Sequence, residues 1–286
     1  MNTTRVTPRE TERRIQRILL PTDLKAGGEA ALSLAATLAR QLWAKLHVLH
    51  VETPFTAEEP ASRLRKLARI ADDHPEVPIV ALSRPGGTPS AAILDYAADN
   101  DVDLIVMAAT RLHQGFGHLL GSVAREVVDG SDCPVLTVRN GDAATGPLLV
   151  RVLVPVDFST ATAGALDLAA EIAHGVKGEL ILLHVIAEHG RGRARLRAEA
   201  EAKLRAIAAT LAPPVSTSIE VRAGNPVDEI VRCSADMGVD LIVIASHASA
   251  GRRMWSGSVA EEVQRFAASP VLLVKGASPD EQRAAG

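Results

Sequence analysis

The chain contains one series of segments twice, in the same order and at nearly constant spacing. RILLPTD at residues 17–23 returns as RVLVPVD at 151–157, so that each residue recurs 134 positions later. KLHVLHV, VDLIVMA, GSVAREVV and CPVLTVR return as ELILLHV, VDLIVIA, GSVAEEVQ and SPVLLVK, displaced by 134 to 137 residues. Self-similarity of this kind indicates a tandem duplication, so the chain is expected to fold as two similar halves.

Within each half, short apolar runs alternate with helical patterns. The runs lack polar alternation, which is typical of strands buried on both faces of a parallel sheet. Residues 29–42 and 161–175 are rich in Ala and Leu at helical spacing, and residues 193–211 predict a charged helix with one apolar stripe, formed by Leu196, Leu204, Ile207 and Leu211. The order predicts an α/β fold: two tandem, doubly wound, five-stranded parallel sheets of the Rossmann-like type.

The repeat also predicts where the domains begin and end. We expect domains at residues 15–140 and 150–276, joined by a Gly-, Pro- and Asp-containing linker at 141–149. The polar ends, 1–14 and 277–286, are expected to be disordered tails. The third helix of each half has a readable start, because Thr88-Pro89 and Asn225-Pro226 each supply an N-cap residue followed by proline at the first helical position.

Composition argues against several classes of partner. The formal net charge is −3 and aromatic residues make up 2% of the chain, whereas a nucleic-acid binder needs a basic face and stacking aromatics. No apolar run approaches the length of a membrane span, and the N-terminal residues show no apolar signal segment. Cys133 and Cys233 lie far apart with no CxxC spacing, which favours free thiols in a reducing compartment. We therefore expect a cytoplasmic protein that binds neither nucleic acid nor membrane.

Two aspartates mark the place where a ligand is expected. In an open parallel sheet, ligands bind beyond the carboxyl ends of the strands, at the point where the strand order reverses. Asp23 and Asp157 directly follow the first strand of each half. Such an aspartate is suited to accept from an adenine amino group or a ribose hydroxyl, and equally suited to cap the following helix. The sequence gives these two interpretations about equal weight.

A Gly-Ser pair opens the fourth helix of each half, at Gly121-Ser122 and Gly257-Ser258. The N–H groups and the dipole of a helix N-terminus favour an anion such as phosphate. The alternative is that the serine only caps the helix. In the second copy, Ser258 and Glu261 have the spacing of a capping box, whereas Arg125 occupies the glutamate's position in the first.

Enzyme chemistry finds little support in the sequence. The chain has no GxxxxGK[ST] loop, no GxSxG elbow and no GxGxxG after its first strand. His50 and His184 end the second strand of each half, where a structural role is favoured. For His113, His118 and His247, a solvated loop position is favoured over contact with a phosphate. No histidine or cysteine cluster suggests a metal site, so we expect a protein without catalytic residues.

At this point several segments together resemble a known family. VPVDFS at 154–159, a strand ending in HV, GNP at 224–226, DLIVIASH and GSVAEEVQRFAASPVLLVK occur in order. This series is similar to the universal stress protein family, and the resemblance covers the whole chain as two tandem copies. It implies a five-stranded parallel α/β sandwich of the adenine-nucleotide-binding type. Many members bind ATP, which Mg²⁺ can accompany, and others bind no nucleotide.

The loop before the Gly-Ser pair departs from the family pattern. ATP-binding members resemble one another in a loop written G-x2-G-x9-G-[ST]. In the first half, Ala109 and Leu112 stand at the first two glycine positions, with eight residues before Gly121. In the second half, Ala245 and Ala248 stand there, again with eight residues before the final glycine. Leucine adds bulk where ribose would lie, so the first half is the poorer candidate.

The resemblance implies a nucleotide site, which we expect in the second half. Val185 would pack against adenine, Asp157 would bond the base edge or the ribose, and Gly257-Ser258 would hold the phosphates. Arg252 and Arg253 either neutralise a phosphate or are solvated surface charges. The expected residues are Pro155, Val156, Asp157, Val185, Ala245, His247, Arg252, Gly257, Ser258 and Val259, with Asp23, Val51, Gly121 and Ser122 at the matching place in the first half.

The sequence thus predicts a stress-response protein that binds adenine nucleotide without catalysis. The alternative is a nucleotide-independent interaction module, in which both loops are only structural. Because single-copy relatives generally pair as dimers, the two copies are expected to pair within the chain, along their last strands CPVLTVR and SPVLLVK. Whether two chains then associate as a homodimer is left open.

Overall fold

The computed structural model describes residues 15–25, 28–53, 59–109, 120–139, 150–186, 192–246 and 258–275. Strands and helices alternate throughout this part of the chain. The first half contains β1 (Arg17–Pro21), α1 (Glu29–Leu42), β2 (Lys45–Glu52), α2 (Pro60–Asp72), β3 (Ile79–Pro85), α3 (Pro89–Asp99), β4 (Leu104–Ala109), α4 (Ser122–Gly130) and β5 (Val135–Arg139). The second contains β6 (Arg151–Pro155), α5 (Thr162–Gly175), β7 (Glu179–Ile186), α6 (Arg193–Thr210), β8 (Ser216–Ala223), α7 (Pro226–Asp236), β9 (Leu241–Ser246), α8 (Ser258–Phe266) and β10 (Val271–Lys275).

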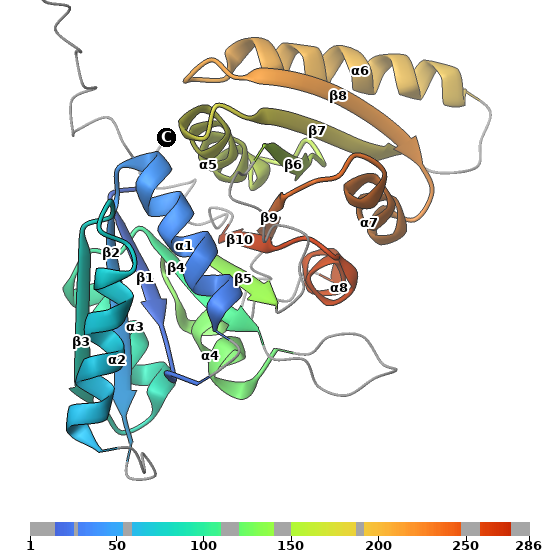
Figure 1. The fold of residues 1–286 in the computed structure, drawn as a ribbon. Coiled ribbons are helices and arrows are strands. Elements are labelled where there is room, and N and C mark those ends of the chain that lie inside the picture. The colour runs from blue at the N-terminus through green and yellow to red at the C-terminus, as the bar shows by residue number, and fades with distance from the viewer. Residues whose placement is uncertain are drawn as a thin grey trace, which may run out of the picture.

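The strands form one continuous sheet in the order β3-β2-β1-β4-β5-β10-β9-β6-β7-β8 (Figure 1). Neighbouring strands within each half are parallel, and the order reverses between β1 and β4 and again between β6 and β9. β5 and β10 pair antiparallel, with Leu136 opposite Leu272. The predicted fold class and the predicted pairing of the last strands are both confirmed. The structure adds that the two sheets join into one.

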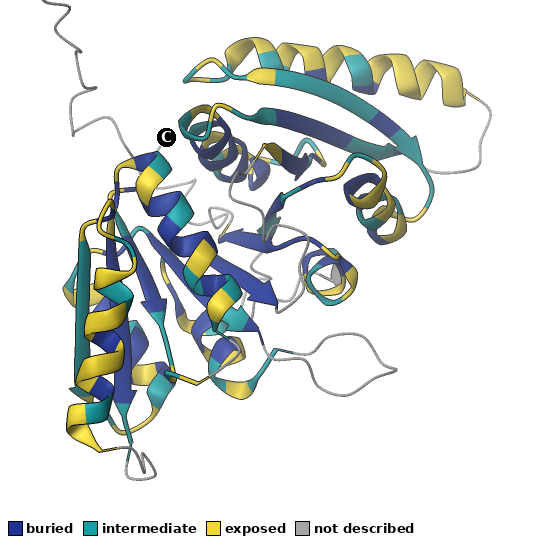
Figure 2. Ribbon diagram, viewed as in Figure 1, coloured by how far each residue is buried: buried dark blue, intermediate teal, exposed yellow. Residues whose placement is uncertain are grey.

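Each face of the sheet carries a hydrophobic core that crosses from one half to the other. Consecutive strand residues point to opposite faces, so Leu20 lies in the core beneath α1, α2, α5 and α6, while Leu19 lies in the core beneath α3, α4, α7 and α8. The inner strands are mostly buried, the edge strands β3 and β8 are mostly of intermediate exposure, and the outer helix faces are exposed (Figure 2). Alanines such as Ala35 and Ala169, both fully buried, let the helices pack close to the sheet despite the scarcity of aromatic residues.

Polar contacts join the two halves beside the antiparallel pair. The Thr137 hydroxyl donates to the Val271 carbonyl (3.3 Å) and accepts from the Gln264 amide (3.1 Å). The Arg139 guanidinium donates to the carbonyl of Ala267. On one helical layer, α1 and α5 approach closely at Gly175, where a Cβ atom would lie 2.4 Å from Leu42 Cδ2. The halves are therefore fastened by backbone pairing, side-chain hydrogen bonds and helix packing.

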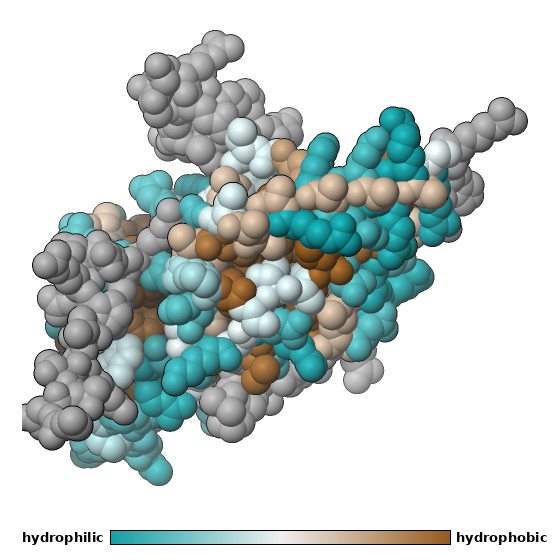
Figure 3. Space-filling model, turned by 90° about the horizontal axis from the view of Figure 1, so that it is seen from above, coloured by the Kyte–Doolittle hydropathy of each residue, from teal (hydrophilic) through white to brown (hydrophobic). Residues whose placement is uncertain are grey.

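Two details of the predicted helices need correction. Leu204 is fully buried, but Leu196 is 40% exposed, so the apolar stripe of α6 does not reach the first turn. Thr88 stands at the N-cap position of α3 but makes no capping hydrogen bond with its side chain. The outer face of α6 is dominated by ion pairs such as Arg195–Glu199 (3.1 Å). Figure 3 looks down on this side and shows hydrophilic residues over most of the described surface, with smaller hydrophobic patches between them.

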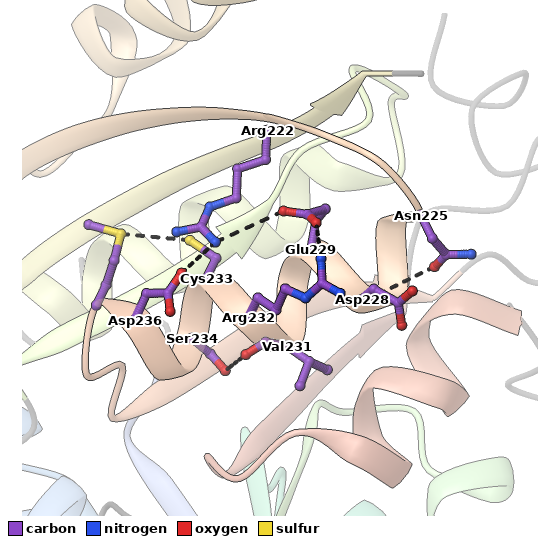
Figure 4. A network of polar contacts seen from close by, with 10 residues as sticks. Arg222, Asn225, Asp228, Glu229, Val231, Arg232, Cys233, Ser234 and Asp236 are labelled. Carbon is purple, nitrogen blue, oxygen red and sulfur yellow. Dashed lines mark hydrogen bonds and ion pairs between the residues drawn. The ribbon is translucent and has the colours of Figure 1, made fainter. Parts of the chain in front are cut away.

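The predicted start of α7 is confirmed. The Asn225 side-chain oxygen accepts from the N–H groups of Val227 and Asp228 (2.9 and 3.3 Å). The same helix is tied to β8, because Arg222 pairs with Asp236 at 2.8 Å (Figure 4). Cys233 on this helix is fully buried, and burial raises the pKa of its thiol to about 11. None of the helices described is long and apolar enough to cross a bilayer.

Candidate functional site

The candidate site of each half lies where the first and fourth strands end side by side. The ladder continues one residue past the first strand, because the Thr22 N–H donates to Leu49 O (2.8 Å) and the Val156 N–H donates to Leu183 O (2.7 Å). Asp23 and Asp157 follow directly and are exposed. This is the edge at which the strand order reverses, and it is where doubly wound sheets bind their ligands. Both aspartates therefore stand at the predicted place.

Asp157 is held by three donors. Its Oδ1 accepts from the Ser159 N–H (2.9 Å), the Ser159 hydroxyl (2.6 Å) and the Thr162 hydroxyl (2.6 Å). Thr162 opens α5 and is buried, so the network joins the strand end to the helix. The N-cap residue of α5 is Ala161 rather than Asp157. Asp157 thus orders the turn before the helix instead of capping the helix itself.

Asp23 has a simpler environment. Its Oδ1 accepts from the Lys25 N–H at 3.0 Å. This bond matches the one that Asp157 receives from Ser159, and both are the turn that Asp side chains form with the backbone two residues on. Lys25 supplies no hydroxyl to match that of Ser159. The turn is therefore shared by the two halves, whereas the side-chain network belongs to the second.

The residue after each aspartate has a positive φ angle. Leu24 has φ 58° and Phe158 has φ 62°, a conformation that is costly for residues other than glycine. The Phe158 ring lies 4.4 Å from the His184 ring, and the Lys203 ammonium lies 5.0 Å from the centre of the Phe158 ring. In the first half, the Lys66 ammonium donates to the Leu24 carbonyl at 3.3 Å. Each half thus holds this strained residue with a lysine from its second helix.

The histidines that end the second strands also serve these loops. His50 Nδ1 lies 2.9 Å from Thr22 O, and His184 Nδ1 lies 2.7 Å from Val156 O. A carbonyl oxygen only accepts, so each Nδ1 must carry the proton and donate. These contacts agree with the structural role that was predicted for His50 and His184.

The helix N-termini differ in charge. Gly121 is the N-cap residue of α4, and Ser122 is its first helical residue and is exposed, so Ser122 does not cap the helix. α8 begins at Ser258, whose side chain lies outside the described atoms, so the predicted capping box stays a prediction. The first turn of α8 carries Glu261, whereas that of α4 has no acidic residue. The N-terminus of α4 is therefore more favourable to an anion.

The sheet register corrects the predicted equivalence of two alanines. Ala108 pairs with Val138, and Ala245 pairs with Val274, its repeat, so the counterpart of Ala245 is Ala108 and not Ala109. Ala109 corresponds to Ser246. The loop to the Gly-Ser pair is consequently one residue longer in the first half. Both halves still lack the first two loop glycines of the family pattern.

The apolar residues expected near a base lie at the same edge. Val51 is buried and Val185 is partly buried, each next to the end of its second strand. Gly86 lets the backbone approach Val51 closely, since a Cβ at Gly86 would lie 2.8 Å from Val51 Cγ1. Val156 is buried, whereas Pro155 and Val259 are partly buried. The second half therefore exposes more apolar surface at Val185 than the first does at Val51.

Several predicted residues lie outside the described part of the chain: His247, Arg252, Arg253 and Gly257 of the second half, and Leu112, His113 and His118 of the first. Among the residues described, no group of three or more His, Cys, Asp or Glu is arranged to hold a metal ion.

Sequence reasoning missed a polar cluster beside the first site. Arg63 of α2 is buried and lies 3.3 Å from the Glu52 carboxylate, which also accepts from the Ser83 hydroxyl at 2.6 Å. The Ser83 hydrogen bond, and then the charge of Arg63, lower the pKa of Glu52. No pattern in the sequence indicates this cluster, because an arginine on a charged helix normally faces solvent.

The comparisons with known proteins agree with this architecture. The sequence model of the universal stress protein family matches residues 14–139 and again residues 150–275. The chain belongs to the universal stress protein family. A universal stress protein of Methanocaldococcus jannaschii is 28% identical over 153 residues, which cover 46% of this chain and 86% of that protein. YxiE, a universal stress protein of Bacillus subtilis, is 30% identical over 145 residues, covering 44% of this chain and 98% of that protein.

Both curated relatives therefore correspond to one half of this universal stress protein. A solved structure matches both halves together. The crystal structure of a universal stress protein from Archaeoglobus fulgidus has a TM-score of 0.72 and 25% identity, and the match covers 91% of this chain and 98% of that one. The tandem arrangement of two family domains is thus found in a relative of nearly the same length.

Proposed function

We propose that this universal stress protein binds ATP in its second half and does not catalyse a reaction on it. The observation that carries the proposal is the Asp157 network, in which three donors hold one exposed carboxylate at the edge where the strand order reverses. A carboxylate fixed before the ligand arrives loses little conformational entropy on binding. Among the residues described, Asp23 accepts from one donor, in its own turn, and so is less preorganised than Asp157.

Each residue of the proposed site has a defined role. Asp157 accepts from the adenine amino group or the ribose hydroxyls, and Val185 packs against the base. The N-terminus of α8 at Ser258 faces the phosphates, with Gly257 and Arg252 contributing from the preceding loop. Mg²⁺ enters only as the companion of the phosphates. The roles of Asp157, Val185 and the Gly-Ser pair follow the resemblance to ATP-binding family members.

Two observations favour the second candidate function, a nucleotide-independent interaction module. Glu261 places a negative charge in the first turn of α8, where it opposes a phosphate. The loop before this helix also lacks two glycines of the family pattern. In such a module the Asp157 network would only shape the loop. The two functions differ in whether the chain takes up ATP at all.

Calorimetric titration with ATP, with and without Mg²⁺, separates the two. The intact chain is expected to bind ATP, Asp157→Ala to bind about tenfold more weakly through loss of a charged hydrogen-bond acceptor, and Asp23→Ala to bind like the parent. Absence of heat at millimolar ATP would contradict the proposal and favour the interaction module. If Asp157→Ala and Asp23→Ala lost ATP affinity equally, the assignment of the site to the second half would be wrong.

Two accompanying proposals have simple tests. We expect no release of phosphate from ATP above the protein-free rate, because among the residues described His184 donates its Nδ1 proton to the Val156 carbonyl and Lys203 lies over the Phe158 ring. We also place the protein in the cytoplasm, since Cys133 and Cys233 are free thiols. Fractionation of the source cells with detection of the native chain tests that placement.

A further inference from the structure

His184 contacts the residues on both sides of Asp157. Its Nδ1 donates to the Val156 carbonyl at 2.7 Å, which fixes the backbone just before the aspartate. Its ring lies 4.4 Å from the ring of Phe158, with 39° between the planes, which holds the residue just after it. The His184 side chain, at the end of β7, therefore contacts the loop around Asp157 at two residues, Val156 and Phe158.

The contact between the His184 and Phe158 rings involves a residue with a strained backbone conformation. Phe158 has φ 62°, a conformation that persists only where the surroundings hold it. If the Phe158 backbone relaxed, the direction of Asp157 and the position of Ser159 would change together, because they are its two neighbours. The Ser159 N–H and hydroxyl supply two of the three hydrogen bonds to Asp157 Oδ1. The geometry of the carboxylate thus depends on the Phe158 conformation.

The first half shows the same device in reduced form. His50 Nδ1 donates to the Thr22 carbonyl at 2.9 Å, and Leu24 has φ 58°. Leu24 offers no ring for His50 to contact, and among the residues described Asp23 accepts one hydrogen bond, from the Lys25 N–H. The repeated histidine therefore holds one side of the loop in the first half and both sides in the second.

We infer that His184 is the positioning residue of the nucleotide site: it sets the direction of the Asp157 carboxylate through Val156 and Phe158 without touching the ligand itself. The inference rests on the nucleotide binding proposed above. It implies that His184 strongly determines the position of Asp157, whereas His50 has little influence on the position of Asp23.

Three variants of His184 separate its two contacts. His184→Asn keeps a donor near the Val156 carbonyl and loses the ring, His184→Phe keeps the ring and loses the donor, and His184→Leu loses both. His50→Leu is the matched control in the other half. Thermal melting of every variant verifies that it is folded before binding is compared.

The readouts are the ATP affinity and the hydrogen-exchange rate of the Ser159 amide, which reports the bond to Asp157 whether or not nucleotide binds. His184→Leu is expected to weaken ATP binding about tenfold and to speed Ser159 exchange about tenfold, the size of one lost hydrogen bond. Asn and Phe are each expected to restore part of both losses. His50→Leu is expected to leave both unchanged.

The outcomes also distinguish this inference from the proposed function. If the parent chain binds no ATP while His184→Leu still speeds Ser159 exchange, the nucleotide function is wrong and the positioning of Asp157 stands. If Ser159 exchange is the same in the parent and in the folded Leu variant, the inference is overturned. It is also overturned if His50→Leu weakens ATP binding as much as His184→Leu does.

Discussion

Asp23 and Asp157 stand at the same place in their halves, 134 residues apart, yet their surroundings differ. Both receive the backbone N–H of the residue two positions on, at 3.0 and 2.9 Å. Only Asp157 also receives two hydroxyls, from Ser159 and Thr162. The backbone turn was kept after the duplication, whereas the side chains around the carboxylate diverged. The difference lies where a ligand would be recognised rather than in the scaffold.

In the hydrophobic interior, by contrast, the first half carries the additional polar side chains. The buried positions of α2 are Arg63 and Leu67, and those of α6, at the same spacing, are Ala200 and Leu204. His47 pairs with Tyr96 at 2.7 Å in the first half, where the second half has Ile181 and Cys233. Among the residues described, the first half therefore has the more polar interior, and the second has more hydrogen bonds to its site aspartate.

What both halves retain is also informative. Arg84 pairs with Asp99 at 3.6 Å, and Arg222 pairs with Asp236 at 2.8 Å, each tying the outermost strand to the helix that follows it. These contacts fasten the edge strands β3 and β8, which have a neighbour on one side only. Contacts that secure the architecture were thus preserved while those at the loops changed.

The largest predicted effect tests the polar interior of the first half. Arg63→Ala is expected to lower the free energy of unfolding by about 2 kcal/mol, mainly because it removes the buried stem of the arginine from the interior. Arg65→Ala, at an exposed position of the same helix, is the control and is expected to change little. Urea unfolding of both measures the difference. Equal stability of the two variants would show that the buried arginine is dispensable.

The second prediction tests the two hydroxyl groups that donate to Asp157. Ser159→Ala combined with Thr162→Val removes both hydroxyl donors to Asp157 and leaves its backbone donor in place. We expect ATP binding to weaken about tenfold, since each lost hydrogen bond to a charged group is worth about 1 kcal/mol or more. Lys25→Ala, at the position that matches Ser159, is expected to leave binding unchanged. Calorimetry measures both, and unchanged affinity in the double variant would separate the network from binding.

These first two predictions rest on features that the sequence could not reveal. The duplication predicted the fold, because a repeated series of buried strands admits few arrangements. The resemblance to a family whose single-copy members generally pair as dimers predicted the pairing of β5 with β10. The hydrogen-bond network around Asp157 depends on the positive φ angle of Phe158, and this angle cannot be predicted from the presence of a phenylalanine. The misalignment of Ala245 arose because the loop before the Gly-Ser pair differs in length by one residue, so counting back from that pair shifts the strand.

The third prediction concerns acid and again separates the interiors. Burial, followed by the charges of Lys45 and Arg17, lowers the pKa of His47 below 6.5. Below pH 6.5 the unfolded chain therefore binds more protons at this residue than the folded chain, so stability falls as the pH drops toward the folded pKa. Melting temperatures measured from pH 7.5 down to 5.5 should decline in the parent chain.

Replacement of the histidine isolates its share. His47→Leu supplies an apolar side chain, as the second half does with Ile181, and is expected to make the decline shallower. A decline of equal steepness in the parent and the Leu variant would assign the acid sensitivity to other groups.

The smallest effect tests α8, the helix proposed to face the phosphates. Glu261→Gln removes the negative charge from the first turn of α8 and is expected to strengthen ATP binding about twofold to threefold at low salt. Glu262→Gln, its exposed neighbour, is the control. Stronger binding by Glu261→Gln than by its control supports phosphates at α8. Identical affinities would place the phosphates elsewhere.

The central claim is that duplication left two similar scaffolds and that one of them carries the nucleotide site. Equilibrium dialysis with labelled ATP measures this directly as the number of nucleotides bound per chain at saturation. We predict one per chain in the parent and in Asp23→Ala, with saturation shifted to about tenfold higher ATP in Asp157→Ala. Two equivalent nucleotides per chain, or none, would contradict the account.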